Sequence, residues 1–135
     1  MPDFNQQVID EFHANGGKVG GEPFEGKNLV LLTHTGAKSG KRRVLPLVYT
    51  TDGSRYVIVA SKGGSDTNPD WYHNLRANPR VTLEIGTETF EATATEITDR
   101  AERDRLYAGM VAHQPAFADY EKKTTRLIPV FVLER

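Results

Sequence analysis

Short segments with strand-like patterns follow one another along most of this chain, and tight turns separate several of them. Asp52-Gly53 is a strong signal for a two-residue hairpin, and Gly86-Thr87 follows Val81–Ile85, where apolar and polar side chains alternate. Strands joined by such short turns pair antiparallel. The full set of predicted strands covers residues 28–33, 44–50, 55–61, 81–85, 89–98 and 127–133. This succession predicts a small barrel or curved sheet that is mostly antiparallel.

Helical patterns occur at the start of the chain and in its later half. Residues 3–15 carry apolar side chains at helical spacing, and Gly16-Gly17 would end that helix. Asn68 as a cap and Pro69 as the first residue predict a short helix. The pattern at 99–113, with Asp99 as its cap and Tyr107 on an apolar stripe that faces the core, predicts a second helix, and the pattern at 115–123 predicts a third. The fold class is therefore α+β. At 135 residues the chain is expected to form one domain, with residues 1–25 as an N-terminal helix and loop.

The composition of the chain argues against several classes of protein function. The net charge of -1 disfavours general nucleic-acid binding, and the absence of cysteine excludes disulfides and thiolate metal sites. The four histidines are scattered without a second ligand at helical spacing, so no metal site is expected. No apolar run approaches the about 18 residues of a membrane span, and the N-terminus lacks a signal-peptide pattern. A cytoplasmic protein with a small-molecule partner is the resulting expectation.

A basic turn follows the first predicted strand. The segment Thr35-Gly-Ala-Lys-Ser-Gly-Lys-Arg-Arg43 combines two glycines, whose backbone N–H groups can turn toward a ligand, with a serine hydroxyl. Its four cations, which match phosphate or carboxylate, are Lys38, Lys41, Arg42 and Arg43. A solvated hairpin tip would carry the same charges, so the turn alone leaves both interpretations open. The spacing does not fit a nucleoside-triphosphate loop, because Gly36 and Gly40 enclose three residues where that loop needs four.

A second segment points to the same kind of ligand. Ser61-Lys-Gly-Gly64 follows another predicted strand, and the helix start at Asn68-Pro69 comes next, with Trp71 and Tyr72 in its first turn. Glycine turns and helix N-termini bind anions and carbonyl oxygens through free N–H groups. The two segments together predict a site for a flat, anionic cofactor, although ordinary helix-to-sheet packing would also explain the aromatic rings. Pro46 lacks an N–H, so its strand requires an edge, a bulge or a ligand-facing gap.

From about Gly26 to Arg135 the sequence resembles the deazaflavin-dependent nitroreductases, which are split-barrel proteins related to the flavin-mononucleotide-binding barrels. The matching motifs are Thr35-Gly-Ala-Lys-Ser-Gly-Lys-Arg-Arg-Val-Leu-Pro-Leu47, Ser61-Lys-Gly-Gly64, Asn68-Pro-Asp-Trp-Tyr-His-Asn-Leu75, Asn78-Pro79, and Tyr120 ahead of Arg126-Leu-Ile-Pro-Val-Phe-Val132. The resemblance implies the split-barrel fold. It also implies coenzyme F420, an 8-hydroxy-5-deazaflavin with a phospholactyl oligoglutamate tail, which delivers hydride in its reduced form.

The resemblance also implies roles for individual residues. It places Lys38, Ser39 and Arg43 near the phosphate and tail, with Lys41 and Arg42 in a supporting electrostatic role. Pro46 and Leu47 would line the face of the ring. The residues implied around the ring are Ser61, Lys62, Gly63, Gly64, Asn68, Pro69 and Trp71.

On the acceptor side the resemblance implies Tyr120 as a catalytic residue that orients the acceptor or relays a proton, with Phe117 beside it in the substrate site. The expected acceptor is a quinone, an enone or a nitro compound. Two alternatives remain open: a flavin-mononucleotide oxidoreductase on the same barrel, and a deazaflavin carrier without enzymatic activity. A homodimer is compatible with this resemblance. Some relatives have an N-terminal helix that touches membranes, but residues 3–15 here favour core packing over a peripheral membrane contact.

Overall fold

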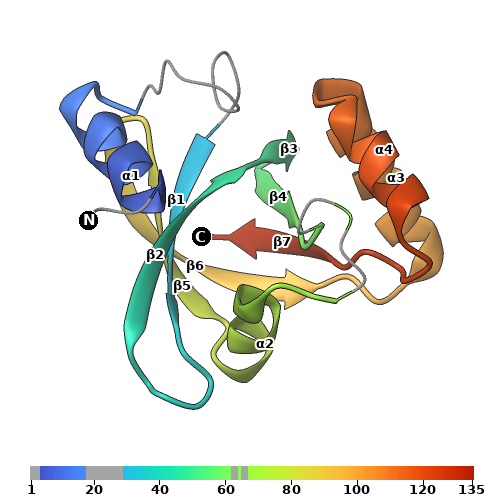
Figure 1. The fold of residues 1–135 in the computed structure, drawn as a ribbon, viewed down its shortest axis with the longest axis horizontal. Coiled ribbons are helices and arrows are strands. Elements are labelled where there is room, and N and C mark those ends of the chain that lie inside the picture. The colour runs from blue at the N-terminus through green and yellow to red at the C-terminus, as the bar shows by residue number, and fades with distance from the viewer. Residues whose placement is uncertain (1–3, 18–28, 62–63, 65–66) are drawn as a thin grey trace.

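The structure is a computed structural model, and it describes residues 4–17, 29–61, 64 and 67–135. Its centre is one curved antiparallel sheet, with helices at its sides and ends (Figure 1). The strands are β1 (Leu29–Thr35), β2 (Arg42–Val48), β3 (Thr50–Asp52), β4 (Arg55–Val59), β5 (Arg80–Ile85), β6 (Glu88–Glu96) and β7 (Val130–Glu134). The helices are α1 (Phe4–Ala14), α2 (Asp70–Ala77), α3 (Arg100–His113) and α4 (Ala116–Lys123).

The strand order is β2-β1-β5-β6-β7-β4-β3, and every pairing is antiparallel. The two edge strands, β2 and β3, are separated by Tyr49 alone, so the sheet must curl back on itself into a half-barrel. This confirms the predicted α+β class and the antiparallel curved sheet. Pro46 pairs by Cα register with Leu31 on β1, and its strand is an edge, as the missing N–H requires.

Several predicted strand boundaries were wrong: the strands expected at 28–33, 55–61 and 89–98 end at Thr35, Val59 and Glu96. The strand expected at 44–50 begins at Arg42 and ends at Val48, so Arg42 and Arg43 belong to the edge strand and not to the basic turn. The last strand begins at Val130 and not at Leu127. These errors concern the ends of short segments, where tertiary pairing overrides local pattern.

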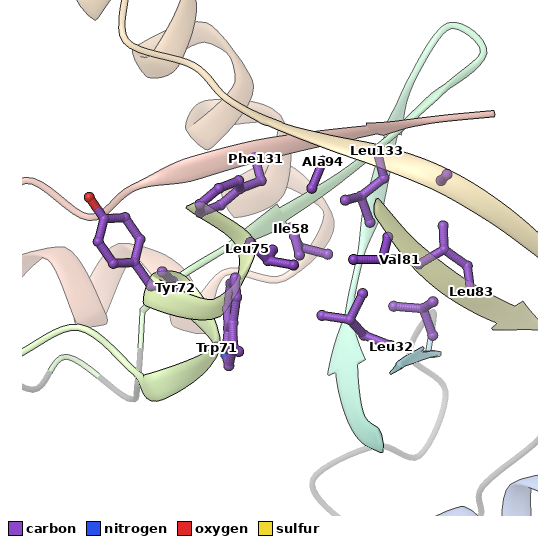
Figure 2. Packing of buried hydrophobic residues seen from close by; sticks show 13 residues of the cluster. Leu32, Ile58, Trp71, Tyr72, Leu75, Val81, Leu83, Ala94, Phe131 and Leu133 are labelled. Carbon is purple, nitrogen blue, oxygen red and sulfur yellow. The ribbon is translucent and has the colours of Figure 1, made fainter. Parts of the chain in front are cut away.

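The main core fills the inside of the half-barrel, and α2 closes one end of it (Figure 2). Trp71, Tyr72 and Leu75 project from α2 onto strand side chains, and the Trp71 ring lies 5.9 Å from the Phe131 ring between centroids. The other fully packed members are Val30, Leu32, Ile58, Ala60, Val81, Leu83, Ala92, Ala94 and Leu133. Helix-to-sheet packing therefore does account for the burial of both α2 aromatics.

Helix α1 packs on the outer face of β1. Val8, Ile9 and Phe12 form a buried cluster with Leu29 and Leu31. This confirms the expectation that the N-terminal helix is part of the core. Among the described residues, no helix has both the length and the apolar content to span a bilayer.

The end of α1 depends on two glycines with positive φ, as predicted. Gly16 has φ 65° and Gly17 has φ 97°, and Gly17 N–H donates to the carbonyl of Phe12. A β-carbon on Gly17 would lie 2.4 Å from the Cα of Gly86 in the β5–β6 turn. The helix end is thus locked against the sheet by a contact that only glycine permits.

Helices α3 and α4 lie together at the end of the sheet away from α1 (Figure 1). The predicted cap is present, because the Asp99 carboxylate accepts a hydrogen bond from Glu102 N–H at 2.9 Å. Tyr107 is buried in the second core cluster, as expected, and its hydroxyl donates to the carbonyl of Phe117 at 2.7 Å. Burial raises the pKa of Tyr107 well above its usual range, so this hydroxyl stays protonated and continues to hold α4 on α3.

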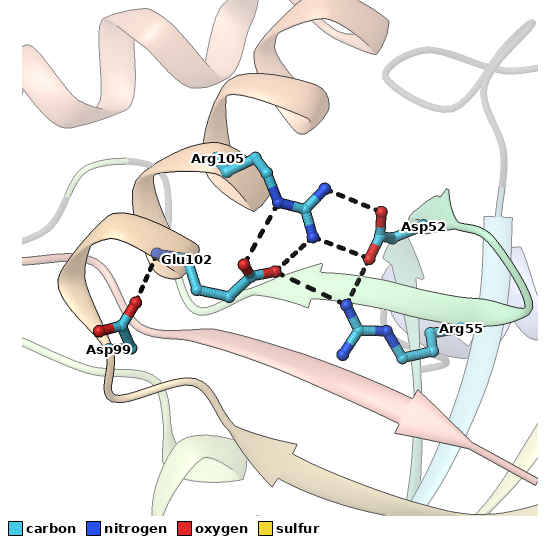
Figure 3. A network of polar contacts seen from close by, with 5 residues as sticks. All are labelled: Asp52, Arg55, Asp99, Glu102 and Arg105. Carbon is cyan, nitrogen blue, oxygen red and sulfur yellow. Dashed lines mark hydrogen bonds and ion pairs between the residues drawn. The ribbon is translucent and has the colours of Figure 1, made fainter.

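A four-residue ion network fastens the β3–β4 hairpin to α3 (Figure 3). Both guanidinium nitrogens Nη1 and Nη2 of Arg105 bind the Asp52 carboxylate at 3.0 Å, and Arg105 also pairs with Glu102. Arg55 pairs with Asp52 and lies 3.7 Å from Glu102. The hydrogen bonds from Arg105 and then Arg55 hold the pKa of Asp52 far below its usual value, and Arg105 lowers the pKa of Glu102.

We expect this network to make stability depend on pH at the acid end. Carboxyl groups with lowered pKa values bind fewer protons in the folded than in the unfolded chain, so their contribution is complete above the ordinary values of 3.8 and 4.5. It is lost progressively as pH falls from those values through the lower pKa values of the folded chain. Thermal melts of Arg105→Gln should therefore show a lower melting temperature than the parent at pH 7 and a smaller difference at pH 3, where the loss has begun. The same substitution at exposed Lys122 is the control. An equal Arg105→Gln deficit at both pH values would contradict a role for the network.

Candidate functional site

A cavity of about 920 Å³ runs along the β2 edge of the half-barrel, between α1 and α2. It is large enough for an extended small-molecule ligand. The β1–β2 turn and the start of β2 form one wall, and α2 forms another. The lining residues are Gln6, Ile9, His34, Gly36, Ala37, Lys38, Ser39, Arg43, Val44, Leu45, Asp70, Trp71, His73 and Asn74.

The basic turn has a closed backbone that orients Ser39. Gly36 N–H donates to the carbonyl of Lys41 at 2.8 Å, and Gly40, with φ 70°, donates back to Gly36 at 3.0 Å. Ser39 Oγ accepts from Lys41 N–H at 3.2 Å, which leaves the hydroxyl proton free to be donated elsewhere. A β-carbon on Gly36 would lie 2.5 Å from Ser39 Oγ, so glycine is required for this arrangement.

Successive side chains of β2 point to opposite faces of the sheet, and this separates two of the cations that are adjacent in the sequence. Arg43 lines the cavity with Lys38, whereas Arg42 donates to Thr82 Oγ1 on β5 at 2.9 Å and is not part of the lining. Neither Arg42 nor Lys41 lies in the cavity wall, so direct anion contacts are available from Lys38 and Arg43. Lys38 and Ser39 are exposed, and Arg43 is exposed on its strand, so a ligand can reach all three.

The start of α2 reaches the opposite wall. The predicted Asn68 cap is wrong: Pro69 occupies the cap position without a side-chain cap, and Asn68 Oδ1 instead accepts from Arg126 at 2.8 Å. The first N–H groups of a helix have no partner within it, so Asp70 and Trp71 offer backbone donors here. Trp71 is buried in the core and also lines the cavity. Its ring is therefore part of the helix-to-sheet packing and is also placed to contact a ligand.

A polar contact inside the cavity wall joins β1, the basic turn and α2. Ala37 N–H donates to Asn74 Oδ1 at 2.8 Å, and Asn74 Nδ2 lies 3.1 Å from His34 Nδ1. His34 is only 3% exposed. Burial and the positive charge of Arg43 lower the pKa of His34, so the neutral ring is favoured near pH 7. Sequence reasoning did not assign His34 or Asn74 to the site, because their contact spans forty residues of sequence.

The other residues predicted to contact the ring lie away from the cavity, near Arg126 and α4. Arg126 donates to the carbonyls of Ala60 and Ser61 at 3.1 and 2.9 Å as well as to Asn68. Gly64, at φ 87°, approaches α4 so closely that a β-carbon would lie 2.9 Å from Lys123 Cβ. Its glycine requirement is therefore explained at least in part by packing. None of Ser61, Gly64 and Asn68 lines the cavity, while Lys62 and Gly63 lie outside the described residues.

The predicted acceptor residues are adjacent to each other on α4. The rings of Phe117 and Tyr120 are 5.2 Å apart in an edge-to-face contact, and both pack against the core cluster beneath α3. Neither lines the cavity. Pro46 is buried and Leu47 packs against the main core, so these two also lie outside the cavity lining.

Together, the half-barrel and the cation-lined cavity define a split-barrel protein of the flavin-binding type. Solved structures of similar fold include an F420-H2-dependent reductase, FDR-A, at 44% identity and TM-score 0.72, covering 79% of this chain and 94% of that one. Another, described as a domain-swapped dimer, has 39% identity and TM-score 0.75 and covers 95% of this chain and 96% of its own. An F420H(2)-dependent quinone reductase of Mycobacterium tuberculosis strain H37Rv is 38% identical over 129 residues, which is 92% of this chain and 85% of that protein.

The chain belongs to the F420H(2)-dependent quinone reductase family, whose model matches residues 5–135. This confirms the predicted relationship, the F420 cofactor and the predicted oxidoreductase class. The protein is a reductase that uses F420H2 and transfers hydride to quinone-like acceptors.

Proposed function

We propose that the cavity between α1, the β1–β2 turn and α2 is the F420 site, with the anionic tail at Lys38, Ser39 and Arg43 and the deazaflavin ring toward α2. The observation that carries this proposal is the convergence of two cations and a serine hydroxyl on one wall of the cavity. Charge-assisted hydrogen bonds of this kind suit phosphate and carboxylate oxygens. The cavity volume of about 920 Å³ supports an extended ligand over a single small anion.

The charges in the cavity also support this orientation. Asp70 lines the α2 side and would repel a multiply charged tail, whereas Lys38 and Arg43 would attract it. The α2 side offers the Trp71 ring and free backbone N–H groups, which suit a flat ring that carries carbonyl oxygens. The tail therefore has better partners at the basic turn and the ring has better partners at α2.

The cofactor supplies the hydride, and the protein's part is to position and shield it. Lys38 and Arg43 would neutralise the negative charge of the tail. The Ser39 hydroxyl would donate a hydrogen bond to a tail oxygen. The N–H groups at the start of α2 donate to an oxygen at the ring edge, where they favour negative charge. Trp71, packed against Phe131, gives that wall a rigid apolar surface that excludes water from one side of the ring.

The acceptor site belongs to the same proposal. Tyr120 would orient a quinone or donate a proton to it, with Phe117 beside it in the acceptor site. The resemblance also proposes Arg42 in a supporting electrostatic role near the tail. The remaining ring contacts that it proposes are Pro46, Leu47, Ser61, Lys62, Gly63, Gly64, Asn68 and Pro69. Support for Tyr120 comes from Gly64: a β-carbon on that glycine would lie 3.0 Å from the Tyr120 carbonyl, so α4 and the predicted ring-binding loop are neighbours. A homodimer is also proposed, because one relative is described as a domain-swapped dimer.

Single-turnover oxidation of the F420H2 complex by a quinone tests the proposed roles. The parent protein should reoxidise the cofactor, and Tyr120→Phe should slow the reaction by about ten- to a thousandfold while F420 affinity is unchanged. Phe117→Leu, which keeps an apolar side chain, is the companion variant for acceptor affinity. An unchanged rate in Tyr120→Phe would remove the hydroxyl from the mechanism. Tight F420 binding without turnover of any quinone, enone or nitro acceptor would favour the carrier alternative.

A further inference from the structure

The contact between His34, Asn74 and Ala37 fixes which nitrogen of the histidine carries its proton. Asn74 Oδ1 accepts from the backbone N–H of Ala37 at 2.8 Å, and only the oxygen of the amide can do this. The Asn74 amide is thereby oriented, and its Nδ2 faces His34 Nδ1 at 3.1 Å as a donor. Nδ1 must then be the acceptor, so the proton of the neutral ring is on Nε2.

The protonated nitrogen is available to a ligand. His34 lines the cavity, and among the described residues its Nε2 has no protein hydrogen-bond partner. Within that part of the chain, the only fully enclosed side-chain nitrogen or oxygen without a partner is Arg103 Nη2. His34 Nε2 is therefore not sealed in the protein, and the cavity is the space it can reach.

The neighbours of His34 indicate which part of a ligand it meets. His34 pairs by Cα register with Arg43 across the β1–β2 ladder. Ala37, whose N–H donates to the same Asn74 side chain, directly precedes Lys38 and Ser39. The lowered pKa of His34 agrees with a neutral donor placed beside these cations. A neutral N–H donor adds a directional hydrogen bond for an anion without adding to the repulsion among the cations.

We propose that His34 is a cofactor-positioning residue of this chain: Asn74 holds it as the Nε2–H tautomer, and that N–H donates to an oxygen of the phosphoryl tail bound by Lys38, Ser39 and Arg43. This inference rests on the proposed F420 site. It adds to that site a neutral donor and a physical link between tail binding and α2, because Asn74 is on α2 and also holds the basic turn. Through Asn74, the positions of His34 and of the basic turn are coupled to the helix that faces the ring.

The tautomer is measured first, on the protein without cofactor. Two-bond nitrogen–proton NMR of the histidine rings near pH 7 should show His34 with Nδ1 unprotonated and Nε2 protonated. F420 should then shift the Nε2–H proton resonance and slow its exchange with water. A neutral ring protonated on Nδ1, or a charged ring under these conditions, would overturn the proposal without any reference to activity.

Affinity provides the second measurement, with F420 and with the same deazaflavin ring lacking the phospholactyl tail. His34→Phe should weaken F420 binding by roughly ten- to a hundredfold, as expected for one lost hydrogen bond to an anion, and leave binding of the tail-less ring unchanged. His34→Gln retains an N–H donor and should recover part of the loss, which also keeps the test valid if the phenylalanine variant folds poorly. His113→Gln, at the exposed end of α3, is the matched control.

The outcomes separate this inference from the proposed function. If the parent binds no F420, the proposed site fails, and the donor role of His34 fails with it. If the parent binds F420 and His34→Phe binds it equally well, the site stands and the role of His34 is wrong. An equal loss for F420 and for the tail-less ring would also overturn the proposal, because His34 would then act on the ring or on the fold and not on the tail.

Discussion

Replacing Lys38 and Arg43 together by alanine is expected to weaken F420 binding by roughly a hundredfold or more, because each residue makes a charge-assisted contact to the tail. The two losses need not add, since the side chains share one ligand. Titration followed by deazaflavin fluorescence measures the effect. Exposed ion pairs are screened within about 8–10 Å at physiological salt, so the double variant should also show a weaker dependence of affinity on salt.

Arg80→Ala is the matched control for that experiment, because Arg80 is an exposed strand arginine that lies 3.9 Å from Glu91 and does not line the cavity. The parent should also bind F420 more tightly than flavin mononucleotide, which offers a single phosphate. Equal loss of F420 affinity in Arg80→Ala would mean that the protein senses only its overall charge. Unchanged affinity in the double variant would identify the basic turn as a solvated hairpin.

Trp71→Ala is expected to produce the largest loss of stability, about 3–5 kcal/mol in the free energy of unfolding, because it removes a large buried ring from the contact between α2 and the half-barrel. This corresponds to a fall in melting temperature of roughly 10–20 °C for a domain of this size. Thermal unfolding of the protein without cofactor measures it.

Trp71→Phe separates packing from ligand contact, since it keeps an aromatic ring against Phe131 and should lose only part of this stability. Leu127→Ala is the control, because Leu127 is 49% exposed and its truncation should change stability by less than about 0.5 kcal/mol. A melting temperature for Trp71→Ala close to that of the Leu127 variant would contradict the assignment of Trp71 to the core.

The sequence predicted the fold well where local chemistry decides it. The Gly86-Thr87 turn, the Asp99 cap and the glycines after α1 are all present, since each depends on a preference of a few adjacent residues. The hairpin predicted at Asp52-Gly53 also forms, but Asp52 pairs with Arg55, so its two loop residues are Gly53 and Ser54. The order of the strands in the sheet could not be read in this way, because it arises from pairings such as β1 with β5 that are distant in sequence.

The candidate site was predicted in part for the same reason. Lys38, Ser39, Arg43 and Trp71 do share one cavity, and each is in a segment whose composition already indicated a ligand. Period-two alternation along β2 could have indicated that Arg42 and Arg43 face opposite sides, had the strand been started at Arg42.

His34 had no local signal. It follows a run of apolar residues on β1, and its donor geometry exists only because Asn74 comes from α2, forty residues further along the chain. The misplaced cap at Asn68 has a similar origin, because Arg126 competes successfully for the same side-chain oxygen. Long-range polar contacts of this kind determine the site and cannot be deduced from spacing.

The structure of the complex with F420 tests the central claim most directly. We expect the cofactor in the cavity along the β2 edge, with its phosphate within hydrogen-bond distance of Lys38, Ser39 and Arg43 and its ring beside Trp71 at the start of α2. A cofactor bound with its tail away from the basic turn, for example at Arg126 and Ser61, would contradict the account.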